Sequence, residues 1–229
     1  MIVIVSLWRN DAERDLLRRM EHLYAKTAEH QDLRWLWVVG DSVDATEKLL
    51  RRYALRDRRI SVIERSFEET GEDVVTRRRR SSWTATQAFA ELHHDADFVC
   101  LHESDLITPL DVLDRLLASG EGRPIAGWPT LCPEVGGPVL FYDIWAYRGC
   151  DGRNFQSTFP YHESYRWRDP FQVGSFGSVW LAPAHLVRNR VMRDEGCVEL
   201  CAQWQQEGIS LLVDPMILVQ QPAHLWSAS

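Results

Sequence analysis

The chain has 229 residues, of which 45% are hydrophobic and 26% charged, and this suits one globular domain with a sizeable buried core. It contains no run of about 18 apolar residues, which excludes a membrane-spanning helix of ordinary length, and its first residues lack the basic segment of a signal peptide. The net charge of −7 excludes a protein that coats nucleic acid with its whole surface.

Apolar runs alternate with helical patterns over the first hundred residues. Strands are predicted at residues 2–6, 34–40, 59–66 and 97–105. Helices are predicted within residues 7–27, 41–55 and 76–94. Such alternation predicts an α/β fold with a mostly parallel central sheet flanked by helices. In this architecture ligands bind at the carboxyl ends of the strands.

The second half of the chain has a different pattern, with more glycine, proline and aromatic residues. Strands are predicted at residues 123–131 and 138–149, a strand and then a helix within 172–187, a helix at 197–208 that ends at Gly208, and the last strands within 209–224. Residues 149–170 are predicted to form a long loop, which in a compact domain is usually functional. Because no linker separates the halves, we expect a single domain over residues 1–229, made of residues 1–110 and a mixed half, residues 111–229.

The segment DADFVCLHESDLITP, residues 95–109, ends a buried strand in two carboxylates, Glu103 and Asp105. Carboxylates this close repel each other unless a cation neutralises them. Mg2+ and Mn2+ bind such oxygens together with substrate phosphates. A structural alternative is that Asp105 caps a helix beginning near Pro109 while Glu103 is exposed. The position at the ligand edge of a parallel sheet favours the metal site.

This segment resembles the DxD-bearing strand of nucleotide-sugar glycosyltransferases with the GT-A fold, with glutamate in place of the first aspartate. SLWRND (6–11) is similar to the first-strand ending of family-2-like members, and VVGDSVDAT (38–46) to their second-strand element. FYDIWAYR (141–148) is similar to a segment of cap-associated and Anp1-type mannosyltransferase relatives. The resemblance implies a GT-A-like (Rossmann-like) fold in which residues 1–110 bind the nucleotide sugar and residues 111–229 form the acceptor side.

The resemblance also implies a set of ligand-binding residues. A late histidine often completes the metal site in this family, so His224 joins Glu103 and Asp105 as ligands of Mn2+ or Mg2+, although a lone histidine is more often structural. The predicted nucleotide-sugar-binding residues are Ser6, Leu7, Arg9, Asp41, Arg77, Arg80 and Ser104. Among them the arginines suit a diphosphate and Asp41 suits the base or ribose. The structural alternative for the arginines is a solvated helix face, and for Asp41 it is a helix cap.

Transfer to a hydroxyl by inversion needs a base on the acceptor side. Glu199 is the first candidate, with Asp194 and Glu195 behind it, and a surface carboxylate is the alternative for each. The predicted acceptor-binding residues are Asp143, Trp145, Arg148 and Trp180. Positions 141, 143, 145 and 147 would share one face if residues 138–149 form a strand.

These residues predict a metal-dependent glycosyltransferase, a hexosyltransferase that moves a hexose from a nucleotide-diphosphate sugar to an acceptor hydroxyl, by default of a glycan. One alternative is a phage-type DNA glycosyltransferase, in which the loop at 148–168 meets a phosphate backbone and a flipped hydroxymethylated base. Another is a catalytically inert GT-A-like binding module. Nucleotidyl transfer is disfavoured because residues 6–11 contain neither glycine nor lysine. Five cysteines without CxxC pairs indicate reduced thiols and a cytoplasmic protein.

Overall fold

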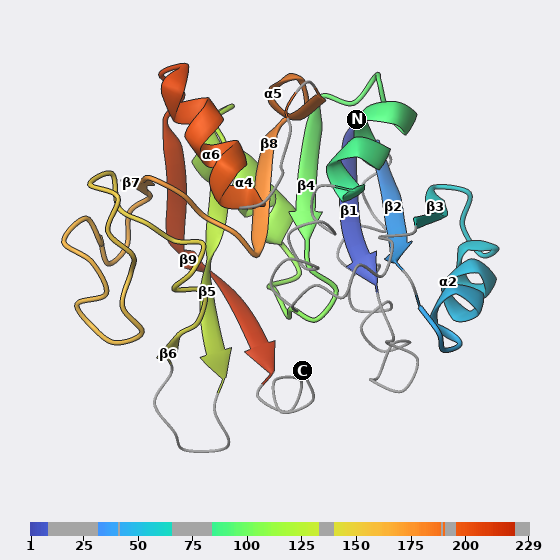
Figure 1. Cartoon of the computed structure of the whole chain (residues 1–229), viewed down its shortest axis with the longest axis horizontal. Coiled ribbons are helices and arrows are strands. Elements are labelled where there is room, and N and C mark those ends of the chain that lie inside the picture. The colour runs from blue at the N-terminus through green and yellow to red at the C-terminus, as the bar shows by residue number, and fades with distance from the viewer. Residues whose placement is uncertain are drawn as a thin grey trace.

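A computed structural model describes residues 1–8, 32–40, 42–65, 84–132, 140–188, 190 and 196–222. Within these residues, the strands form one continuous sheet (Figure 1). The strands are β1 (Ile2–Trp8), β2 (Leu33–Gly40), β3 (Ile60–Arg65), β4 (Phe98–His102), β5 (Ile125–Cys132), β6 (Leu140–Phe141), β7 (Phe171–Val173), β8 (Val179–Pro183) and β9 (Leu211–Pro222). The helices are α2 (Thr46–Ala54), α4 (Val112–Gly120), α5 (His185–Arg188) and α6 (Cys197–Gln206), and residues 84–92 are also helical.

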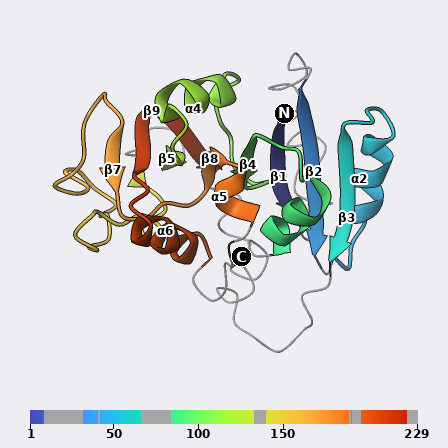
Figure 2. The ribbon, with the colours of Figure 1, turned by 90° about the horizontal axis from the view of Figure 1, so that it is seen from above.

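The order of strands across the sheet is β3-β2-β1-β4-β8-β5-β9-β7, with β6 paired to β5 (Figure 2). β1 is parallel to both β2 and β4, and β2 is parallel to β3, so the predicted parallel half is confirmed. β8 is antiparallel to β4 and β5, while β5 and β9 are parallel. The second half is therefore mixed, as its sequence predicts.

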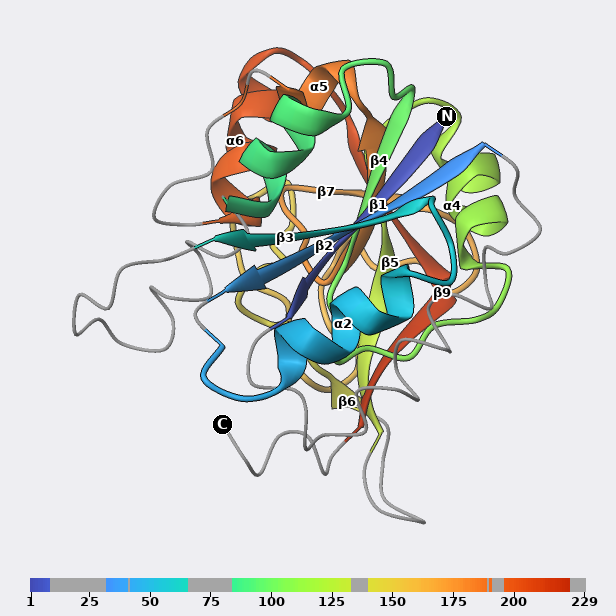
Figure 3. The same ribbon diagram turned by 90° about the vertical axis from the view of Figure 1, so that its right-hand side faces the viewer.

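Helices cover both faces of the sheet (Figure 3). α2 and α4 pack on one face, where Leu50 and Leu116 join a buried cluster that contains Trp8, Trp35 and Trp37. The helix at 84–92, α5 and α6 pack on the other face and build a second buried cluster with side chains of β1, β2, β4 and β8. Strands covered on both faces are apolar at nearly every position, which explains why β2 lacks the alternation of a half-exposed strand.

Local chemistry accounts for the boundaries of two helices. Before α2, the Oδ1 of Asp44 accepts a hydrogen bond from the backbone N–H of Thr46 at 2.9 Å, which satisfies a donor at the helix start. α6 ends at Gln206, two residues before Gly208, whose φ of 77° is the left-handed conformation that glycine adopts easily. The predicted end of this helix is confirmed.

One predicted element is wrong. Of the described residues 140–149, only Leu140–Phe141 pair with β5, and a turn follows at 144–146, so this segment is not the expected long strand. The helix after β4 begins at Val112, shortly after Pro109, and its N-cap is Asp111. The helix predicted within 7–27 lies outside the described residues apart from residues 7 and 8, which belong to β1. In the described part of the chain no helix is both long and apolar enough to cross a membrane.

Candidate active site

The carboxyl ends of β1, β2, β4, β5 and β9 lie at one edge of the sheet. Because β8 is antiparallel to both β4 and β5, these two strands point the same way, and β9 is parallel to β5. β1 and β2 point in the same direction as β4. Figure 1 shows these ends together at the lower edge of the sheet. The turn after β4 and the end of β9 therefore lie on the same side of the molecule, although the sequence separates them by more than 110 residues.

The turn after β4 is closed by the side chain of His102, which is buried. Its Nδ1 lies 2.8 Å from the carbonyl oxygen of Glu103, and its Nε2 lies 3.1 Å from the Oγ1 of Thr108. Since a carbonyl only accepts, Nδ1 carries a proton and donates to Glu103. The two contacts of His102 hold the segment 103–108 in one shape, with Ser104 buried and Glu103 and Asp105 half-buried.

Asp105 is tied to the end of β9. The Nε2 of Gln221 donates a hydrogen bond to its Oδ2 at 3.0 Å. Two residues beyond Asp105, the backbones of Ile107 and Gln220 exchange N–H to O bonds of 2.8 and 2.7 Å. Asp105 does not cap a helix, because α4 begins seven residues later. The alternative interpretation, in which Asp105 is the cap of the following helix, is therefore wrong.

The donor atoms of this turn suit a divalent cation. The two half-buried carboxylates of Glu103 and Asp105 are the hard oxygen donors that Mn2+ and Mg2+ prefer. No group of three or more His, Cys, Asp and Glu side chains that could hold a metal occurs among the described residues. The predicted third ligand, His224, lies outside them.

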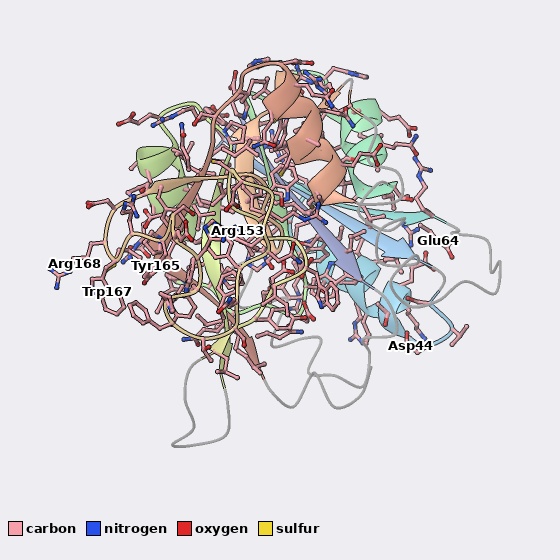
Figure 4. All side chains as sticks on the ribbon, turned by 60° about the vertical axis from the view of Figure 1, so that its left-hand side comes forward. Asp44, Glu64, Arg153, Tyr165, Trp167 and Arg168 are labelled. Atoms are coloured by element: carbon pink, nitrogen blue, oxygen red, sulfur yellow. The ribbon has the colours of Figure 1, made fainter. Side chains whose placement is uncertain are left out.

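The predicted nucleotide-sugar residues are only partly described. Ser6 is fully buried within β1, and its Oγ has no hydrogen-bond partner in the described ranges. Leu7 is half-buried against the core. Four further residues predicted to bind the nucleotide sugar lie outside the described residues, namely Arg9, Asp41, Arg77 and Arg80. In Figure 4, Asp44 and Glu64 lie at the β2–β3 end of the sheet, away from the loop that carries Tyr165 and Trp167.

Asp143 lies in a turn rather than on a strand. Its Oδ1 accepts the backbone N–H of Ala146 at 3.3 Å, and its Oδ2 accepts the hydroxyl of Ser178 at 2.8 Å. An aspartate that bonds its own following backbone favours a turn over a strand ladder. The prediction that residues 141, 143, 145 and 147 share a strand face is therefore wrong. Ser178 has a φ of 63°, a strained conformation for a residue that is not glycine.

The charges of Glu103 and Asp143 act on the same two groups, the thiol of Cys197 and the hydroxyl of Tyr147. Burial first, and then these two charges, raise the pKa of Cys197 to about 12, while the hydrogen bond from Trp180 acts in the opposite direction. The pKa of the buried Tyr147 is likewise raised well above its usual value, by burial first and then by Asp143 and Glu103. Cys197 is the first residue of α6, and Glu199 lies in the same first turn, half-buried. The charges of Glu103 and Asp143 thus both act on Cys197 at the start of α6.

The remaining predicted residues have different outcomes. Trp180 is 0% exposed, and its Nε1 donates to the Sγ of Cys197 at 3.4 Å, so it is a core residue and its predicted contact with an acceptor is wrong. Trp145 is 78% exposed in the turn after Asp143. Arg148 is half-buried, and its backbone forms bridges to Asn154 and Ser175. Two of the predicted positions, Asp194 and Glu195, lie outside the described residues.

The long loop predicted at 149–170 is confirmed, since the described chain has neither helix nor extended strand between Phe141 and Phe171. Aromatic contacts organise it: the rings of Tyr161 and Tyr165 lie 5.2 and 5.0 Å from that of Trp128. Trp167, 66% exposed, lies at the outer end of this cluster, beside Arg168 (Figure 4).

Sequence patterns did not single out three residues that shape the site, namely His102, Ser178 and Gln221. The signal for Gln221 was present, because two glutamines interrupt the apolar run of the last strand just before Pro222. Ser178 carried no such signal, since its strained backbone becomes visible only in the folded chain.

Several solved glycosyltransferase structures have the same fold. GalNAc-T7 with UDP, GalNAc and Mn2+ matches with a TM-score of 0.67 at 13% identity, over 97% of this chain and 43% of that one. The mannosyltransferase PcManGT from Pyrobaculum calidifontis, in complex with GDP-Man and Mn2+, matches with a TM-score of 0.58 at 15% identity, over 96% and 56%. TarS 1-349 from S. aureus with UDP-GlcNAc matches with a TM-score of 0.56 at 10% identity, over 100% and 61%.

This chain has the GT-A fold. It spans about half the length of the solved structures that it matches. No protein-family model and no curated protein matches its sequence. The likeness to GT-A structures therefore lies in the arrangement of the strands and helices and not in the sequence.

Proposed function

We propose that this GT-A chain is a metal-dependent glycosyltransferase that moves a hexose from a nucleotide-diphosphate sugar to an acceptor hydroxyl, by default of a glycan. The observation that carries the proposal is the half-buried pair Glu103 and Asp105, held in a closed turn at the carboxyl end of β4. In parallel sheets with helices on both faces, ligands bind at the carboxyl ends of the strands. Similar structures were solved with UDP, GDP-Man or UDP-GlcNAc, and two of them with Mn2+.

Glu103 and Asp105 would hold Mn2+ or Mg2+, with His224 as the third ligand. When bound, such an ion neutralises the charge that develops on the diphosphate leaving group. The chain's own cations would share this task, because arginine binds phosphate through two parallel hydrogen bonds. Arg9, Arg77 and Arg80 are the candidates. Asp41 would accept hydrogen bonds from the base or ribose, and the segment at Ser6 and Leu7, together with Ser104, would line the donor site.

The acceptor would enter beside Asp143, whose carboxylate is fixed by Ser178 and which shares the surroundings of Glu103. Trp145 offers an exposed ring for stacking on a sugar face, and Arg148 lies on the same loop. Glu199 would take the proton of the acceptor hydroxyl as general base. Asp194 and Glu195 are the next candidates.

The proposal also includes a relation to particular glycosyltransferases and a cytoplasmic location of the protein. The motif at residues 141–148 suggests a relation to cap-associated and Anp1-type mannosyltransferases. The thiols of Cys100, Cys150, Cys197 and Cys201 form no disulfide among the described residues, which suits a cytoplasmic protein.

The test is the thermal stability of the chain with UDP-, GDP-, CDP- and TDP-sugars, each measured with Mn2+ and with EDTA. A donor at 100 times its Kd adds about 2.7 kcal/mol of stability. We expect one nucleotide class to stabilise the wild type only with Mn2+, and Asp105→Ala to lose this effect. Asp32→Ala, an exposed carboxylate at the opposite edge of the sheet, serves as the control and should respond like wild type. If no donor stabilises the chain with Mn2+, the proposal is wrong.

A further inference from the structure

Gln221 occupies an unusual place for an amide side chain. It lies near the end of β9 and is 3% exposed, and most of the other buried side chains of this strand are apolar. Its Nε2 donates to the Oδ2 of Asp105 at 3.0 Å across 116 residues of sequence. A buried amide with one long-range bond to a candidate metal ligand needs a physical reason.

The amide can have only one orientation in this contact. An ionised carboxylate accepts hydrogen bonds and donates none, so the NH2 group must face Asp105. The oxygen Oε1 therefore points elsewhere. It is buried, and it has no hydrogen-bond partner in the ranges that the structure describes. A purely structural amide would be expected to use both of its polar atoms, because a buried acceptor without a donor is unfavourable.

The backbone next to Gln221 holds this geometry in place. The paired bonds between Ile107 and Gln220 fix the acidic turn on β9, so the backbones that carry Asp105 and Gln221 cannot separate without breaking them. β9 is itself held along its length by parallel pairing with β5. The oxygen Oε1 is thus rigidly placed beside a carboxylate that would bind a cation.

We propose that Gln221 is a positioning residue of the metal site, whose N–H group orients Asp105 and whose Oε1 accepts a hydrogen bond from the hydrated divalent cation. The inference rests on the proposed function, since it requires a cation at Glu103 and Asp105. Partners that orient metal ligands in this way typically change metal affinity 10- to 100-fold when they are removed.

The test measures the binding of Mn2+ directly, by the loss of the free-ion EPR signal on titration of the full chain, with Mn2+ alone and with UDP or GDP added. We expect Gln221→Met to weaken Mn2+ binding by about 10-fold or more. Gln172→Met is the matched control. Gln172 lies on β7 opposite Leu212, at the far end of β9, and its amide also donates one side-chain bond, to Ser210. This control should bind Mn2+ like wild type.

Gln221→Asn provides a second measurement in case the methionine variant does not fold. It keeps the amide but is one methylene shorter, so it withdraws the N–H from Asp105, and its Mn2+ affinity should also fall. Unfolding temperatures in EDTA separate this role from a structural one, because a merely structural residue would lower the stability and leave the Kd unchanged. A wild-type Kd in both Gln221 variants would overturn the inference while leaving the proposed function intact. A wild type that binds no Mn2+ under any of these conditions would overturn both.

Discussion

Replacing Tyr147 with phenylalanine removes a single hydroxyl from the interior of the protein. The side chain is fully buried, and its hydroxyl donates to the carbonyl oxygen of Gly127 at 2.7 Å, with the carbonyl of Gly177 at 3.3 Å. Gly127 lies where the register between β5 and β9 shifts, between Ala126 and Trp128. The tyrosine hydroxyl therefore donates a hydrogen bond to a carbonyl oxygen at the point where the pairing of β5 with β9 is irregular. Phenylalanine leaves that carbonyl oxygen without this donor.

The size of the effect follows from this geometry. Phenylalanine retains the ring and nearly all of the apolar area, so the loss is that of a buried hydrogen bond with an unsatisfied acceptor, about 1–3 kcal/mol. For a chain of this length each kcal/mol lowers Tm by about 2–4 °C. Burial raises the pKa of Tyr147, so its hydroxyl stays protonated at neutral and mildly alkaline pH. The destabilisation should therefore be the same at pH 6 and pH 9.

Urea unfolding, followed by tryptophan fluorescence, measures this loss. Tyr161→Phe is the control, because Tyr161 is half-buried in the loop at 149–170 and its hydroxyl makes no hydrogen bond within the described residues. We expect the control to stay within about 0.5 kcal/mol of wild type. If Tyr147→Phe is as stable as Tyr161→Phe, the hydrogen bond to Gly127 does not contribute as the geometry indicates.

Two further predictions concern the same core. At pH 8.5, iodoacetamide should modify the exposed Cys150 and leave Cys197 and Cys201 unmodified until the chain unfolds, as mass spectrometry would show, because burial raises the pKa of both thiols. The folded pKa of Cys197, about 12, lies above its unfolded value of 9.0, so its stability contribution is complete below about pH 9 and falls as the pH rises toward 12. Gly127→Ala should cost about 1–3 kcal/mol in urea unfolding, since the new methyl would lie 2.5 Å from the Cγ2 of Val219. An unchanged urea midpoint would contradict this packing argument.

The parallel half of the fold could be predicted because its signals are local. The apolar runs of β1, β2, β3 and β4 and the polar residues that end them are legible over a few neighbouring positions. The same holds for the acidic turn, since a strand that ends in Glu103 and Asp105 places them at the ligand edge of any parallel sheet. The prediction of a strand at 138–149 was wrong because the apolar pattern of this segment suits a strand, whereas the hydrogen bond from the backbone N–H of Ala146 to Asp143 stabilises a turn.

By itself, the sequence determined which residues end the strands, and through them the sheet edge and the chemistry that a ligand would meet there. Only the tertiary structure decided which of these residues act together. The Gln221 amide reaches Asp105 because the end of β9 pairs with β5 from Trp128 to Cys132, and Trp180 is a core residue because α6 covers it. Such contacts join positions far apart in the chain, and they depend on strand order and register, which no local pattern contains.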